Sequence, residues 1–160
     1  MPFDRNIIEQ FVSGGPILRT SVQGLSPSDF VAHPVPGAWS IQQIVIHMQD
    51  SDTIGVDRMK RVIAERNPLL LNYDETAFSE KLFCDQQLIE DALTLFDLTR
   101  RQFARVLRAL PDEAYDRSGI HSEAGKLTLG MLVKKYVGHF DHHLPFIHEK
   151  RALLGKPLSR

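Results

Sequence analysis

The sequence predicts an all-α protein: a four-helix bundle in one domain spanning residues 1–160. Four long segments carry apolar residues at helical spacing, and proline, glycine or polar residues separate each segment from the next. No segment carries a strong strand signal. Four apolar stripes in a chain of 160 residues are buried most simply against one another, as they are in a bundle.

The first helix is expected over about residues 3–25. Ile7, Phe11 and Leu18 lie at helical spacings within it. The run Gly14-Gly15-Pro16 stands in its middle. Proline lacks an amide hydrogen and glycine is a poor helix former, so this helix is expected to be kinked or broken there.

The second helix is expected to begin after Ser40. Ser40 followed by Gln43 fits a capping box, in which each side chain bonds the other residue's backbone amide. The helix should end before Pro68, because the residue before a proline disfavours helical conformation. Residues 67–84 then form an irregular connection, with a short turn at 75–81.

The last two helices follow polar connections. The third is expected to begin near Asp85 and to stop at Pro111. Gly119 and Gly125 then mark a small hairpin or a loop. The fourth helix is expected over about residues 128–154, with a glycine directly after it as the C-terminal stop.

The composition limits the classes of partner. The chain has 19 Lys and Arg against 20 Asp and Glu, which argues against nucleic acid, because such proteins carry a clustered basic excess. Cys84 is the only cysteine, so no internal disulfide forms and a reducing compartment is expected. Residues 1–4 begin no apolar signal segment, and no stretch approaches the ~18 apolar residues of a membrane span. A cytoplasmic protein without a membrane partner is expected.

Two of the seven histidines form a pair on one helix face. His139 and His143 are four positions apart, so both imidazoles can point at one ion. Their stripe continues through mostly core-like residues, which places the pair toward the bundle interior. His142 and His148 fall off this stripe and are expected on the surface, whereas His121 lies in a polar loop from which it could reach the entrance of a site.

His47 is the natural third ligand, two turns into the second helix on a largely apolar face. A buried polar group without a partner costs about 1–3 kcal/mol. Three imidazoles from two facing helices would hold Zn²⁺ or Ni²⁺ and leave a fourth position open, as catalytic sites do. Spacing alone leaves the alternative open, because such pairs arise by chance and a core histidine is more often hydrogen-bonded than a ligand.

Four further residues are candidates for the surroundings of this site. Metal-bound histidines usually donate their second ring N–H to a carboxylate or carbonyl, and Asp50 and Asp141 are near the ligands in sequence. Asp50 lies roughly 60° off the stripe of His47, however, and the alternative for each acid is a solvated surface position. Arg58, three turns after His47, could meet an anionic substrate group, or instead form a salt bridge within the bundle. Tyr136 could line a pocket or be an ordinary buried tyrosine.

The sequence resembles the DinB/YfiT-like superfamily of metalloenzymes. Residues 36–51, PGAWSIQQIVIHMQDS, resemble the second-helix motif of the family: a Trp-Ser start, an apolar run, then a metal-binding histidine and acidic residues. The segment 125–129, followed by 139–143, resembles the last helix of the family, which supplies a histidine pair four apart. Residues 58–61 and 68–74 also look like one subgroup, so the likeness covers nearly the whole chain.

The resemblance implies an up-down-down-up bundle, often a homodimer, with one divalent ion on His47, His139 and His143. Characterised members include S-transferases that use thiols such as bacillithiol or mycothiol, an isomerase and hydrolase-like proteins. The chemistry that this implies is metal-assisted thiol transfer or hydrolysis on a small molecule. One departure is Pro145, two residues after His143, which is expected to bend the fourth helix.

Two other functions are alternatives to an enzymatic one. The first is a non-catalytic stress or interaction protein whose metal merely joins two helices. The second is a scaffold, dimeric through a helix face, whose histidines bind nothing. A structural metal should stabilise the fold strongly and exchange slowly, whereas a catalytic one should have a position that small thiols or inhibitors can occupy.

Overall fold

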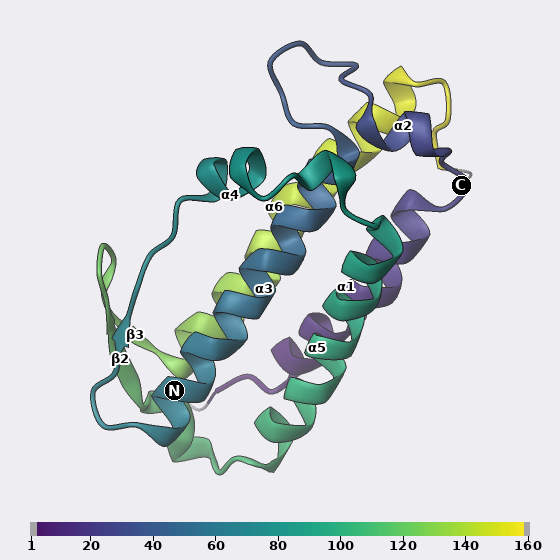
Figure 1. The fold of residues 1–160 in the computed structure, drawn as a ribbon. Helices are drawn as coiled ribbons and strands as arrows, with labels where there is room; N and C mark the ends of the chain where they lie inside the picture. The colour runs from purple at the N-terminus through teal and green to yellow at the C-terminus, as the bar shows by residue number, and fades with distance from the viewer. Residues whose placement is uncertain (1–2, 159–160) are drawn as a thin grey trace.

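Four long helices make up most of the structure, a computed structural model that describes residues 3–158 (Figure 1). These are α1 (Asn6–Val22), α3 (Ile41–Ala64), α5 (Ile89–Ala109) and α6 (Leu129–Leu153). Helices α1 and α6 run in one direction and α3 and α5 in the other, so the order is up-down-down-up (Figure 1). The main packing pairs join α1 to α5 and α6, and α3 to the same two helices. The predicted four-helix bundle is confirmed.

Side-chain caps fix the starts of the two helices that carry the histidines. The amide of Gln43 donates to Ser40 Oγ at 3.1 Å, and the amide of Ser40 donates back to Gln43 Oε1 at 2.8 Å, which confirms the capping box. Helix α6 begins after Thr128, whose Oγ1 accepts from the amide of Met131 at 3.2 Å. It continues through Pro145 to its C-terminal turn.

Helix α1 runs unbroken through residues 14–16, so of the two expectations for this segment, a kink or a break, the break is wrong. The two glycines have a packing role instead. A Cβ added at Gly14 would collide with the guanidinium of Arg100, and one at Gly15 would collide with Asp97. Since both partners belong to α5, the glycines allow α1 and α5 to approach closely.

The connections hold more regular structure than the sequence indicated. A short helix α2 (Pro27–Val31), with a capping box from Ser26, was not anticipated. Helix α4 (Glu75–Lys81) forms where a turn was expected. The third long helix begins about one turn later than predicted, because Cys84–Gln86 form a separate 3₁₀ turn before it.

A small three-stranded sheet lies beside the bundle (Figure 1). Strands β2 (Ser118–His121) and β3 (Gly125–Thr128) form the hairpin that was one of two alternatives for this segment. Strand β1 (Leu69–Leu70) adds to β2 in parallel, with Leu70 opposite His121. Strands of two to four residues are too short to show apolar alternation, so Gly119 and Gly125 were the only signal for the hairpin and β1 had none. The sheet ties the chain after α3 to the segment before α6.

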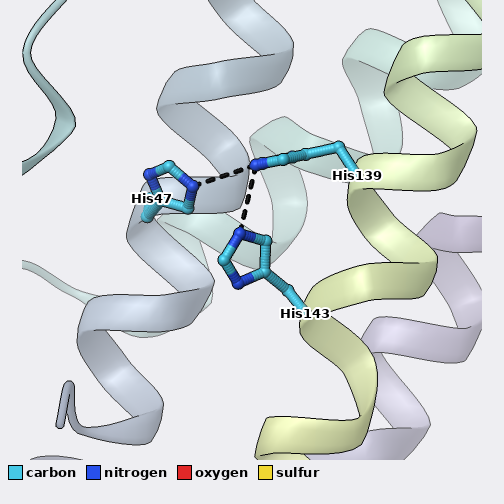
Figure 2. A group of neighbouring side chains, drawn as sticks. All are labelled: His47, His139 and His143. Carbon is cyan, nitrogen blue, oxygen red and sulfur yellow. Dashed lines mark hydrogen bonds between the residues drawn. The ribbon is translucent and has the colours of Figure 1, made fainter.

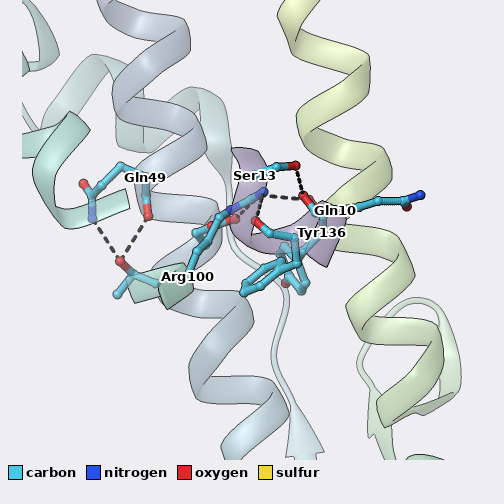
Figure 3. Close-up of polar contacts among 8 residues, drawn as sticks. Gln10, Ser13, Gln49, Arg100 and Tyr136 are labelled. Carbon is cyan, nitrogen blue, oxygen red and sulfur yellow. Dashed lines mark hydrogen bonds and ion pairs between the residues drawn. The ribbon is translucent and has the colours of Figure 1, made fainter. Parts of the chain in front are cut away.

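A buried polar contact divides the apolar core into two clusters. Arg100 of α5 lies fully buried against Asp52 of α3, and its guanidinium also packs over the rings of Phe11, Phe96 and Phe140. Figure 3 shows the same side chain reaching the backbone of Tyr136 on α6. Nothing in the sequence pattern indicated this contact. Among residues 3–158, no helix is both long enough and apolar enough to cross a membrane.

Candidate metal centre

Three histidine side chains converge between α3 and α6 (Figure 2). The Nε2 atoms of His47 and His139 lie 3.0 Å apart, and those of His143 and His139 lie 3.1 Å apart. One nitrogen from each ring lies within 4.8 Å of the other two. The structure therefore brings together the three residues that the sequence singled out, because α3 and α6 are antiparallel neighbours.

Burial keeps the three rings neutral. Loss of solvation lowers the pKa of His47 to about 4 and that of His143 to about 4. The pKa of His139 falls to about 3, because burial and the two neighbouring imidazoles all disfavour its charged form. Trp39 adds to the shielding, with its ring centroid 4.9 Å from that of His47. Neutral imidazoles are the form that binds a metal.

The donor set fits a divalent transition metal. His139 Nε2 faces two other ring nitrogens, yet one ring nitrogen can donate only a single hydrogen, so mutual hydrogen bonds cannot satisfy all three. A cation among them would accept all three lone pairs. Two nitrogen ligands on a tetrahedral Zn²⁺ lie about 3.3 Å apart, since each Zn–N bond is roughly 2.0–2.1 Å long, and the observed spacings are close to this value.

An acidic side chain that sequence reasoning missed lies at the same place. Glu75, the first residue of α4, places Oε2 3.6 Å from His47 Nε2. Its side chain is 57% exposed, so it faces solvent on one side and the histidines on the other. The sequence gave no sign of this approach, because it depends on how the connection after α3 folds back over the bundle.

The two aspartates that were candidates for supporting the ligands lie in different surroundings. Asp50 is half-buried and lines, with His47 and Glu75, a small enclosed space beneath α4, and burial raises its pKa. Asp141 lies exposed on α6. Among the described residues, neither carboxylate is within hydrogen-bond distance of a histidine of the cluster.

A cavity of about 660 Å³ opens beside His139. Arg58 and Tyr136 both line it, and both are buried. Arg58 Nη1 donates to the Tyr136 hydroxyl at 3.0 Å, and Arg58 Nη2 donates to the carbonyl of Leu71. The alternative of a salt bridge for Arg58 is not found, since no carboxylate of residues 3–158 lies within 4.0 Å of its guanidinium. The other lining residues are Ser51, Asn72, Tyr73, Asp74, Glu75, Glu123 and Lys135.

The remaining histidines stay outside the cluster. His142 and His148 are exposed, as predicted. His121 is buried at the end of β2, where its Nδ1 accepts from the amides of Glu123 and Ala124 at 3.3 Å. It is not among the residues that line the cavity.

Comparison with known proteins gives one family. The family model of the DinB superfamily matches residues 10–147. A protein of Oceanobacillus iheyensis named "putative metal-dependent hydrolase" is 29% identical over 131 residues, which cover 82% of this chain and 76% of that protein. YfiT of Bacillus subtilis carries the same description and is 27% identical over 139 residues, covering 86% of this chain and 78% of YfiT.

Solved structures agree with the sequence matches. The YfiT structure, described as an unusual four-helix bundle, superposes with a TM-score of 0.88 at 26% identity, covering 94% of this chain and 86% of YfiT. A mycothiol-dependent maleylpyruvate isomerase superposes with a TM-score of 0.71 at 10% identity, covering 91% of this chain and 60% of the isomerase. The second likeness is one of fold alone.

Proposed function

Since the chain belongs to the DinB superfamily, we propose that it is a metal-dependent hydrolase of a small molecule, with one divalent ion held by His47, His139 and His143. The observation that carries this proposal is the convergence of three neutral imidazole nitrogens beside an open cavity. The names of the relatives from O. iheyensis and B. subtilis support the same reaction class. Zn²⁺ and Ni²⁺ remain the predicted ions, because imidazole suits both.

Three protein ligands favour catalysis over a structural role. Structural zinc sites are normally closed by four protein ligands, whereas catalytic sites keep one position for water or substrate. A divalent ion in such a site supplies Lewis acidity, which lowers the pKa of water and polarises a carbonyl oxygen. The cavity beside His139 provides the access that a substrate needs, and its volume lies in the range of small-molecule sites.

Glu75 is the residue proposed to move the proton. In hydrolysis, water adds its oxygen to the electrophilic carbon of the substrate and loses one proton, which ends on the leaving group. Glu75 Oε2, 3.6 Å from His47 Nε2 and open to solvent, is placed to accept that proton and return it to the leaving group. Tyr136 and Arg58, which line the same cavity as His139 and Glu75, would hold the substrate.

Thiol transfer is the second candidate, and the size of the cavity favours it, because a thiol cosubstrate could lie beside the substrate. The thiol would have to come from outside the chain. Cys84, the single cysteine, is buried, and burial raises the pKa of its thiol. In this reaction the thiol, in place of water, would lose its proton to Glu75. A possible homodimer, suggested by the family resemblance, stays a prediction.

The first test is the metal content of the purified protein. After incubation with Zn²⁺ or Ni²⁺, elemental analysis of the wild type should find close to one ion per chain. The same analysis of the His47→Ala variant should find no bound ion. His142→Ala is the matched control, because His142 lies beside His143 on α6 but offers no ligand atom to the cluster. Equal metal in the wild type and His47→Ala would refute the site.

A screen for turnover then separates the chemical alternatives. Metal-loaded protein should hydrolyse activated esters or amides in water alone if hydrolysis is the reaction. Turnover that requires an added low-molecular-weight thiol would instead support transfer. If the metal-loaded protein catalyses neither hydrolysis nor thiol transfer, and its metal exchanges only over days, a structural role of the metal would be favoured.

A further inference from the structure

We propose that Arg58 forms a carboxylate-binding subsite in the cavity beside the histidines, so that the substrate is a short molecule with a single negative charge. The inference rests on the proposed function only in taking His139 as the side of the cavity where the reaction occurs. The subsite itself belongs to the apoprotein and does not depend on a bound metal.

The first observation is a buried charge without a counterion. Arg58 is 4% exposed, yet both of its hydrogen bonds are to neutral groups, the Tyr136 hydroxyl and the Leu71 carbonyl. Its Nε is buried and has no hydrogen-bond partner within the described part of the chain. Burying a cation is costly unless an anion or several hydrogen bonds compensate, so this guanidinium has capacity for an anion.

The other two buried arginines show what compensation looks like in this fold. Arg100 is paired with the Asp52 carboxylate. Arg151 donates to the carbonyls of Ser21 and Gln23, at 3.2 and 2.9 Å, where the end of α1 carries partial negative charge. Neither lines the cavity beside His139, whereas Arg58 does. Within residues 3–158, Arg58 and Arg151 both lack a carboxylate partner, and Arg58 is the one of the two that a ligand can approach from the cavity.

The neighbours of Arg58 complete the subsite. Because the Tyr136 hydroxyl accepts from Arg58, its own hydrogen remains free to donate to a ligand. Lys135 lines the same cavity, and its pKa is lowered mainly by burial and further by the charge of Arg58. Tyr136 and His139 are three residues apart on α6, about 4.5 Å along the helix axis. A carboxylate bound at Arg58 would therefore place the reacting carbon only a few bonds away.

The charges around the cavity favour one negative charge over two. Arg58 and Lys135 contribute two positive charges, but Asp74, Glu75 and Glu123 line the same space. These three carboxylates would repel a dianion such as phosphate about twice as strongly as a ligand with one negative charge. A carboxylate carries one charge, and its two oxygens match the planar guanidinium.

The test uses propionate and inorganic phosphate as probes of the full-length, metal-free protein. Nitrogen-15 NMR of arginine Nε–H groups should show the Arg58 signal shifting saturably with propionate. Arg151 serves as the internal control, since its Nε is also buried without a partner but lies outside the cavity. Phosphate should bind at least about tenfold more weakly than propionate. Equal shifts at Arg58 and Arg151, or tighter binding of phosphate, would overturn the proposal.

Variants separate this subsite from the metal centre. Arg58→Met should weaken propionate binding by about 10-fold or more, as expected when a hydrogen bond to a charged group is lost. Arg58→Lys retains the positive charge and controls for misfolding of the Arg58→Met variant. It should bind propionate with intermediate affinity. Arg151→Lys should bind like the wild type. Propionate should still bind His143→Ala, so a failed metal site would leave this result intact. Unchanged binding in both Arg58 variants would refute the subsite.

Discussion

Arg100 and Asp52 form an ion pair that is almost completely withdrawn from solvent, with exposed fractions of 0% and 1%. Arg100 Nη2 donates to Asp52 Oδ1 at 3.0 Å, and the same nitrogen donates to the backbone carbonyl of Tyr136 at 3.0 Å. Nη1 donates to the carbonyl of Phe11 at 3.1 Å. One side chain thus joins all four long helices, and its contact with Tyr136 on α6 is visible in Figure 3. Tyr136 precedes His139 by about one helical turn.

Removing one partner of this pair should be strongly destabilising. Asp52→Ala leaves a buried guanidinium without its counterion, so the free energy of unfolding should fall by about 3–5 kcal/mol. Urea denaturation followed by circular dichroism measures this. Asp57→Ala is the matched control on the same helix, because its pair with Arg61 is exposed and should be worth less than about 1 kcal/mol. Equal losses for the two variants would contradict the assignment.

Gly14→Ala should destabilise the bundle, although alanine is the better helix former. The added methyl group would collide with Arg100, and overpacking of this kind costs about 1–3 kcal/mol. Gly138→Ala on α6 is the control, because a Cβ there meets no atom within 4 Å. It should stabilise the protein by up to about 1 kcal/mol. Thermal unfolding of both variants measures whether the two changes in stability have opposite signs.

The metal-free protein should lose stability as the pH falls from about 6.5 to about 4. The pKa of His47, His139 and His143 is lowered in the folded state, so in this window the unfolded chain binds more protons. The melting temperature measured against pH should therefore fall less steeply for His139→Gln than for the wild type. His142→Gln, with an exposed ring, is the control. Identical profiles for the wild type and His139→Gln would count against neutral buried imidazoles.

Glu75→Gln should separate metal binding from proton transfer. The amide is nearly isosteric with the carboxylate but cannot accept the proton, so turnover should fall by about 10²- to 10⁴-fold while the metal content stays near that of the wild type. Glu80→Gln, also exposed on α4, is the matched control. If Glu75→Gln instead releases the metal and leaves no activity to measure, Glu75 is a fourth ligand, and the closed, structural reading gains support.

Local signals in the sequence were sufficient to predict the four long helices and the histidine pair on the last of them. The capping box at Ser40 and the cap at Thr128 act within one turn, so their residue types alone predict the two helix starts. The spacing of His139 and His143 likewise depends only on the helical repeat. That His47 faces them followed from family resemblance and from the burial expected of its helix face.

Features that depend on tertiary packing were not predictable in this way. Gly14 indicated a break by its intrinsic propensity, but its role is set by an arginine 86 positions later in the chain. Asp52 and Arg100 carry no pattern in the sequence that indicates their pairing, because only the packing of α3 against α5 brings them together. Glu75 approaches the histidines only because the chain after α3 folds back across the bundle, which no local pattern encodes.

The antiparallel contact of α3 with α6 also constrains how the protein matures during synthesis. His47 emerges from the ribosome before His139 and His143, which belong to the last of the four long helices. A nascent chain that lacks α6 presents only one of the three imidazoles of the cluster, and a single imidazole cannot hold an ion tightly. If the proposed ion is bound, it can be held only after α6 has been made and has packed against α3, so a translation product that ends before α6 would not compete for the cell's metal supply.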